Sequence, residues 1–154
     1  MATDQSITIV SKSDKQTENI AARIGSQLIG GEVIELVADL GGGKTTFVRG
    51  LARGIGSSDH VSSPSFTISN EYKGKELQLI HFDFYRLGQA GLVENALIEF
   101  LGKPGIVVVV EWADIIKRVL PSERLSIDFR VISEESRKLS LTYPKSLDYL
   151  VEGF

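Results

Sequence analysis

A glycine-rich loop between an apolar run and an amphipathic stretch constrains the fold of this chain more than any other feature. The run over 32–37 has the length and composition of a buried β-strand. The stretch after the loop spaces its apolar residues as on one face of a helix: Phe47, Val48, Leu51 and Ile55. Between them stand Ala38, Asp39, Leu40, Gly41, Gly42, Gly43, Lys44 and Thr45. Strand, glycine loop with Lys-Thr, and helix in this order form the pattern of a Walker A loop.

The residue types in this loop suit the binding of phosphate groups. Glycines let backbone N–H groups converge on phosphate oxygens, and a helix N-terminus adds unpaired donors and a favourable dipole. Lys44 would contact the β- and γ-phosphates, and the Thr45 hydroxyl would bind magnesium. The strict pattern begins with Gly where this chain has Ala38, a small change if the backbone there is not left-handed. The alternative is a glycine-rich turn that binds nothing.

Two acidic residues stand where strands are expected to end. Asp83 follows the run 79–82, and Glu111 follows the unbroken apolar run 107–110, which is typical of a central parallel strand. A P-loop site needs a carboxylate at such a position to hold the metal and its waters. Glu111 has the more typical setting, and Asp83 would hold a metal-shell water or orient the attacking one. The alternative for either is a strand-end acid that caps a helix or pairs with Arg86, and His81 is expected to be a hydrogen-bonded structural histidine.

The rest of the chain alternates strand-like and helix-like segments. Strands are expected at 6–10, 66–72, 76–84, 106–110, 124–132 and 138–143, and helices at 17–29, 90–101 and briefly after Pro144. The turns at 73–75 and 133–136 join neighbouring strands as hairpins. We therefore expect one α/β domain over 1–154, a three-layer P-loop NTPase fold with a central, mostly parallel sheet and antiparallel hairpin additions.

Composition excludes several classes of protein. The 154 residues contain no cysteine, which rules out a disulfide framework and thiolate metal sites and fits a reducing compartment. A net charge of -3 gives no support for a stand-alone nucleic-acid binder. The first ten residues lack the pattern of a signal peptide, and no run is long enough to cross a membrane. We expect a cytoplasmic protein without membrane contact.

Several segments together resemble one family. In their order and spacing they look like TsaE, the bacterial P-loop ATPase of tRNA threonylcarbamoyladenosine synthesis, over about residues 13–142. The segments are 38–50 (ADLGGGKTTFVRG), 63–66 (SPSF), 81–87 (HFDFYRL) and 110–112 (VEW). The last two are more specific than the Walker loop by itself.

The resemblance implies an ATPase that uses ATP, with ADP as product, and Mg²⁺. It would work with a two-protein threonylcarbamoyl transferase complex that modifies the adenosine next to the anticodon of certain tRNAs. It would support the multi-turnover cycle of that complex without transferring the group itself, and tRNA would be contacted only indirectly.

The resemblance also implies roles for particular residues. Thr45 and Glu111 would bind magnesium, Lys44 would bind the phosphates, and Asp83 would assist the metal site or hydrolysis. Further nucleotide contacts are implied for Thr46, Asp14, Trp112, Asp114 and Arg137.

Three other classes of function are alternatives for a chain with this loop. A GTP-dependent switch would need a guanine-reading N/T-K-x-D motif after the loop, and none is present. A small-molecule kinase needs an arginine-bearing lid; Arg118 and Arg124 surround Pro121, but no long helical lid is visible. A nucleotide-gated interaction protein with little hydrolysis would use the same residues, so the sequence leaves it open.

Overall fold

A seven-stranded sheet forms the centre of the molecule. The structure, a computed structural model, describes residues 4–38, 43–62, 69–84 and 90–154. The strands are β1 (Gln5–Ser11), β2 (Val33–Val37), β3 (Ser69–Lys73), β4 (Gln78–Asp83), β5 (Ile106–Glu111), β6 (Leu125–Val131) and β7 (Arg137–Tyr143). The helices are α1 (Asp14–Gln27), α2 (Lys44–Gly54) and α3 (Ala90–Ile98), with the 3-10 helices η1 (Ala113–Val119) and η2 (Lys145–Val151).

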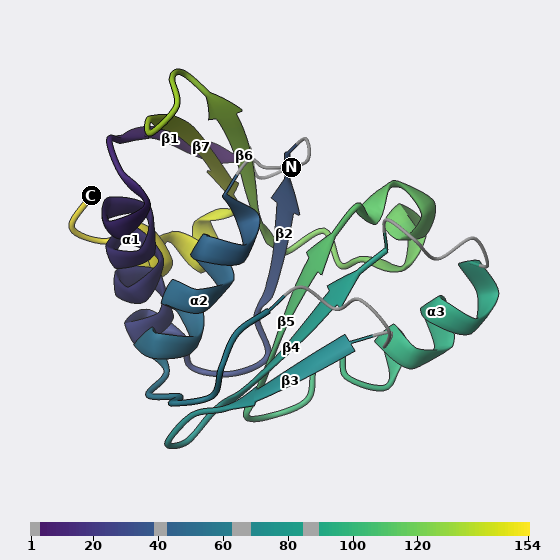
Figure 1. Cartoon of the computed structure of the whole chain (residues 1–154). Helices are drawn as coiled ribbons and strands as arrows, with labels where there is room; N and C mark the ends of the chain where they lie inside the picture. Colours follow the sequence, from purple (N-terminus) through teal and green to yellow (C-terminus); the bar gives the residue numbers. More distant parts are fainter. Residues whose placement is uncertain (1–3, 39–42, 63–68, 85–89) are drawn as a thin grey trace.

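The strand order is β1-β7-β6-β2-β5-β4-β3 (Figure 1). The four central strands β6, β2, β5 and β4 run parallel. The β6–β7 and β3–β4 hairpins and the β1–β7 pair are antiparallel and form the two margins of the sheet. The expected parallel centre with antiparallel hairpin additions is confirmed.

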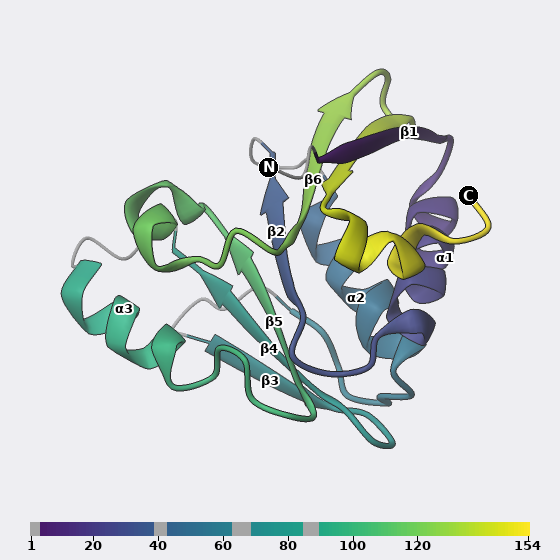
Figure 2. The ribbon, with the colours of Figure 1, turned by 180° about the vertical axis from the view of Figure 1, so that it is seen from behind.

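Helices cover the two faces of the sheet in different regions. Helices α1 and α2 and the C-terminal η2 lie on one side, whereas α3 and η1 lie on the other (Figures 1 and 2). Strand β5 contributes to both cores, because Val107 and Val109 join the apolar cluster under α1 and α2, while Val108 and Val110 join the cluster under α3 and η1. This alternation is why β5 is apolar at successive positions, and it confirms the three-layer α/β architecture.

Glycines fix the position of α2 against α1. A Cβ at Gly50 would lie 2.2 Å from the Glu18 carbonyl oxygen, and one at Gly54 would lie 2.4 Å from that of Ala22. Only glycine permits backbones to approach this closely. Since α2 carries Lys44 at its first position, this contact also sets the position of the residue expected to bind phosphate.

Some boundaries differ from the expected ones. Helix α1 begins at Asp14 and not at residue 17, because the Ser13 hydroxyl accepts a hydrogen bond of 3.0 Å from the Gln16 N–H and caps the helix. Helix α3 ends at Ile98, short of residue 101, and η1 was not expected at all. The short helix after Pro144 is confirmed as η2. In the described ranges no helix combines the length and the hydropathy that a bilayer crossing requires.

Candidate phosphate and metal site

The glycine loop stands at the carboxyl end of the parallel strands. Strand β2 ends at Val37 and α2 begins at Lys44. Residues 39–42 of the loop, which include Asp39, Leu40, Gly41 and Gly42, lie outside the described residues, as do residues 63–66 and Arg86. Gly43 has a φ of 99°, a left-handed conformation that glycine adopts without strain. Ala38 does not have a positive φ, so alanine meets the backbone condition for the first loop position.

Lys44 is held by two groups next to the loop. Its side chain is buried, with 8% of the residue exposed. The Nζ atom donates to the Ala38 carbonyl oxygen at 3.3 Å and lies 4.5 Å from the centre of the Trp112 ring. A cation over an indole face is an attractive arrangement. The ammonium group is therefore kept beside the loop by weak contacts that a phosphate can replace.

Trp112 has an unusual backbone. With φ 58° and ψ 49° it is left-handed, and it is the one non-glycine residue with positive φ in the described part of the chain. Such a conformation costs on the order of 1–3 kcal/mol and is concentrated at functional sites. Here it turns the chain from the end of β5 into η1 and directs the indole towards Lys44. Asp114 follows in η1, but its side chain lies outside the described part.

Asp83 and Glu111 end neighbouring parallel strands at the same level. They are direct partners in the β4–β5 register, and the Phe84 N–H donates to the Glu111 carbonyl oxygen at 3.1 Å. Glu111 is also level with Leu36 of β2, so it lies one strand from the strand that leads into the loop. The side chain of Asp83 also interacts with the Glu111 carboxyl and contributes to lowering its pKa. The structure thus brings together the two acids that the sequence placed at strand ends.

The side chain of His81, on β4, contacts that of Glu111 on the neighbouring strand β5. Its side chain is fully buried, and its Nε2 atom is 3.2 Å from Glu111 Oε2. The contact has ion-pair distance but not the direction of a good hydrogen bond, and neither ring nitrogen has another hydrogen-bond partner among the described residues. The residue lies in the core, but the expectation of a hydrogen-bonded histidine is wrong for the described residues, because its close polar contact is an undirected one with a candidate metal ligand. The sequence offered one sign that His81 lies on the same face of the sheet as the acids: it is two residues from Asp83, and residues two apart on a strand share a face.

The surroundings of Glu111 favour its charged form. Burial by itself raises the pKa of this carboxyl, but the close contact with His81, the Lys44 ammonium and the interaction with Asp83 outweigh it. The net result is a pKa below the usual value. A charged carboxylate that is only 2% exposed is an unusual group, because burying a charge is costly without partners.

These residues fit a magnesium ion bound together with phosphates. Magnesium prefers oxygen ligands and is usually held by one or two carboxylates plus substrate phosphates and water. Asp83 and Glu111 supply two carboxyl groups, and Thr45 is the second residue of α2. In the described part of the chain no three His, Cys, Asp or Glu side chains form a metal cluster.

Asp14 and Arg137 lie at the same end of the sheet as the loop. Arg137 begins β7, where it pairs with Ser11 and with Val131 at the end of β6, and Asp14 begins α1 just after Ser11. The Arg137 Nη1 atom donates to three carbonyl oxygens of the β6–β7 turn, those of Ser133, Glu134 and Ser136. The structure therefore gives Arg137 a role in shaping the turn. Thr46 lies half-buried in the first turn of α2.

Comparison with known proteins supports one family. The family model "Threonylcarbamoyl adenosine biosynthesis protein TsaE" matches residues 11–139. Proteins named tRNA threonylcarbamoyladenosine biosynthesis protein TsaE are 38% identical in Bacillus subtilis (strain 168), covering 83% of this chain and 80% of the relative, and 36% identical in Nostoc sp., covering 92% and 89%. The relative from Treponema pallidum is 34% identical, covering 86% of this chain and 97% of its own.

The fold agrees with a solved structure as well. The crystal structure of YdiB from Bacillus subtilis superposes with a TM-score of 0.79 at 33% sequence identity, covering 99% of this chain and 95% of that one. Family model, relatives and structure agree over most of the chain, and the glycine loop, the paired acids and Trp112 all lie within the matched residues. This chain belongs to the TsaE family, whose members are named for tRNA threonylcarbamoyladenosine biosynthesis.

Proposed function

We propose that this chain is a Mg²⁺-dependent ATP-binding and ATP-hydrolysing accessory protein of the tRNA threonylcarbamoyladenosine machinery. It supports the turnover of the threonylcarbamoyl transferase complex and does not transfer the group itself. The observation that carries the proposal is that Lys44 is close enough to Glu111 to lower its pKa, while Glu111 and Asp83 end adjacent strands at the same level. The names of the relatives support the place in tRNA modification.

The residues divide the work by position. The loop N–H groups and the start of α2 would bind the phosphates, and Lys44 would leave the Trp112 face to contact the β- and γ-phosphates. Thr45 and Glu111 would hold magnesium, which would neutralise part of the phosphate charge. Asp83, level with Glu111 but one strand further from the loop, would hold a metal-shell water or orient the attacking water.

Hydrolysis by the chain in isolation should be slow. Phosphoryl transfer is catalysed by positioning and by positive charge placed on the transition state. Three arginines that could supply such charge are committed elsewhere: Arg53 contacts Glu18 and Asn19, Arg118 pairs with Glu94, and Arg124 pairs with Glu35. A partner protein would supply the missing charge or order a loop over the γ-phosphate, which would couple hydrolysis to the state of the transferase.

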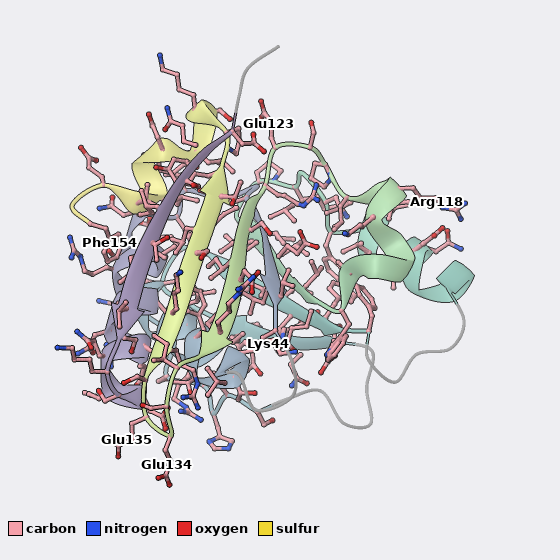
Figure 3. The ribbon with its side chains drawn as sticks, turned by 90° about the horizontal axis from the view of Figure 1, so that it is seen from above. Lys44, Arg118, Glu123, Glu134, Glu135 and Phe154 are labelled. Carbon is pink, nitrogen blue, oxygen red and sulfur yellow. The ribbon has the colours of Figure 1, made fainter. Side chains whose placement is uncertain are left out.

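The structure weakens the case for a small-molecule kinase. Arg118 and Arg124 were the candidates for a lid, and both are paired with acids of the fold. Arg118 projects from the far side of η1, well away from Lys44 (Figure 3). A nucleotide-gated interaction protein stays the main alternative, since it uses the same binding residues without rapid hydrolysis.

Steady-state ATP hydrolysis by the chain, with and without the purified transferase pair, tests the proposal. We expect slow hydrolysis by the chain and an increase when the pair is added. Fast hydrolysis that the pair leaves unchanged would contradict the accessory role. Calorimetry with ATP and GTP tests the choice of base, and tighter binding of GTP would contradict the assignment to adenine nucleotides. Nucleotide-dependent association with the pair without any hydrolysis would favour the gated interaction protein.

A further inference from the structure

The buried His81 is a polar residue of the core to which the proposed function gives no role. It lies in the middle of β4, paired with Val109 of β5 and Asn70 of β3, and is fully buried. Neither ring nitrogen makes a directed hydrogen bond to the described residues, and its close polar contact is the one between Nε2 and Glu111 Oε2 at 3.2 Å. A buried polar group without a good hydrogen bond destabilises the folded protein. An apolar residue would therefore suit a purely structural position better.

The sheet places His81 where it can act on Glu111. His81 and Asp83 share one face of β4, and Val109 and Glu111 share the corresponding face of β5. This is the face covered by α1 and α2, because Leu79 and Val109 belong to the apolar cluster of those helices. The imidazole thus lies between the apolar core and the Glu111 carboxyl, on the side of the sheet from which α2 presents Lys44.

One carboxyl oxygen of Glu111 is consequently in contact with the imidazole of His81. His81 contacts Oε2, and this contact restricts rotation of the carboxyl about its terminal bond. Residues behind a metal ligand commonly fix its orientation in this way, and their loss weakens metal binding about 10–100-fold. Asp83 cannot replace this contact, because it approaches from the end of β4 and is itself a candidate for the metal site.

We propose that His81 is a positioning residue for the magnesium site, which holds the Glu111 carboxyl in the orientation that binds the metal. The inference rests on the proposed function, because it presupposes that Glu111 binds magnesium with the nucleotide. It assigns His81 no contact with nucleotide and no part in proton transfer.

Binding of a non-hydrolysable ATP analogue, measured by calorimetry in Mg²⁺ and in EDTA, separates positioning from folding. His81→Leu keeps apolar bulk but removes the nitrogen, whereas the amide of His81→Gln places an N–H near the position of Nε2. The chain has two histidines, and His60 is exposed in a loop, so His60→Leu is the matched control. Thermal melting of each variant reports on the fold.

We expect His81→Leu to bind the analogue in EDTA as the parent does, but to lose about 10-fold or more of the tightening that Mg²⁺ gives. His81→Gln should recover most of it, and His60→Leu should match the parent. If His81→Leu does not fold, His81→Asn replaces it, because its shorter amide does not reach Glu111.

Unchanged Mg²⁺ tightening in a folded His81→Leu protein would overturn the inference and leave the proposed function standing. Equal losses in His81→Leu and His81→Gln would overturn it as well, since both variants change the core but only His81→Leu lacks a nitrogen near Glu111. A parent protein whose binding does not respond to Mg²⁺ would overturn the proposed function itself and the inference with it. Mn²⁺ binding in the presence of ADP, followed by electron paramagnetic resonance, gives a readout of the metal that does not depend on hydrolysis.

Discussion

The Nζ atom of Lys44 lies 4.5 Å from the centre of the Trp112 ring, and this contact joins the glycine loop to the end of β5. The two residues come from α2 and from the turn after Glu111, which are far apart in the chain. The contact depends on the left-handed backbone of Trp112, because an ordinary conformation would direct the indole elsewhere. The lysine at the end of the glycine loop and the acidic end of β5 are thereby connected.

Trp112 should report nucleotide binding directly. It is the only tryptophan in the chain, so intrinsic fluorescence comes from one site. Phosphate binding draws the Lys44 ammonium away from the indole face and changes the environment of the ring, so the emission should change when ADP or ATP is added. Lys44→Ala is the control, because its emission should already differ from that of the parent. An emission spectrum unaffected by saturating nucleotide would contradict the proposed movement of Lys44.

Removing the Lys44 side chain should abolish most of the ATP hydrolysis and leave the fold intact. Lys44→Ala removes the charge placed at the β- and γ-phosphates, and we expect hydrolysis to fall at least ~100-fold, or roughly 2.7 kcal/mol of transition-state stabilisation. Lys145→Ala, an exposed lysine on η2, is the matched control and should hydrolyse ATP normally. Near-normal hydrolysis by a folded Lys44→Ala protein would refute the Walker assignment.

The elements that carry the site were predictable because their sequence patterns are local. The apolar run of β5 requires burial on both faces, and a loop of glycines followed by Lys44 and Thr45 has few structural uses other than phosphate binding. The positions of the acids at the ends of β4 and β5 were predicted from the apolar runs that precede them. Parallel strands bring their carboxyl ends to one edge, so two separate predictions became one site.

The contacts within the site could not be predicted, because they depend on strand order and side-chain direction. That His81 meets Glu111 requires β4 and β5 to be neighbours in this register. The sequence of η1 has no regular spacing of apolar residues from which a helix could be predicted. The positive φ of Trp112 is imposed by the tertiary structure, because a bulky residue disfavours this conformation. Arg137 shows the same limit, since its bonds to three turn carbonyls depend on the shape of a turn that the sequence indicated only as polar.

The glycine contact between α1 and α2 should be sensitive to a single methyl group. In Gly50→Ala the new Cβ would lie 2.2 Å from the Glu18 carbonyl oxygen and 2.5 Å from Ala21 Cβ, so the helices must separate. We expect a loss of about 1–3 kcal/mol in the free energy of unfolding, measured with urea. Arg49→Ala, at the exposed neighbouring position, should change it by less than about 0.5 kcal/mol. Equal stability of the two variants would show that α2 is free to shift.

Glu111 should make stability depend on acidity in a defined direction. Its pKa in the folded protein lies below the usual value of 4.5 that it has when unfolded. Its contribution is therefore fully present above about pH 4.5 and is lost as the pH falls through the lower folded-state pKa. Glu111→Gln does not titrate, so the parent should lose more stability than this variant below pH 4.5. If the free energy of unfolding falls equally with pH in both proteins across this range, the lowered pKa of Glu111 is contradicted.

Replacing Glu111 and replacing Asp83 should impair different properties of the protein. Glu111 is 2% exposed and lies one strand from the loop strand, whereas Asp83 lies two strands away and is less buried. Glu111→Gln should therefore lose the Mg²⁺-dependent part of ATP binding together with hydrolysis. Asp83→Asn should bind Mg²⁺-ATP within about 3-fold of the parent but hydrolyse it about 100-fold more slowly.

Calorimetry in Mg²⁺ and in EDTA measures the first property of these variants, and single-turnover hydrolysis with the transferase pair measures the second. Both substitutions keep the size of the side chain, and melting curves verify the fold. The opposite pattern would make Asp83 the inner metal ligand, because a carboxylate that only positions water has no effect on the affinity for Mg²⁺-ATP. Loss of metal-dependent binding in both variants would mean that the two acids bind the metal as one unit, with the water positioned by another group.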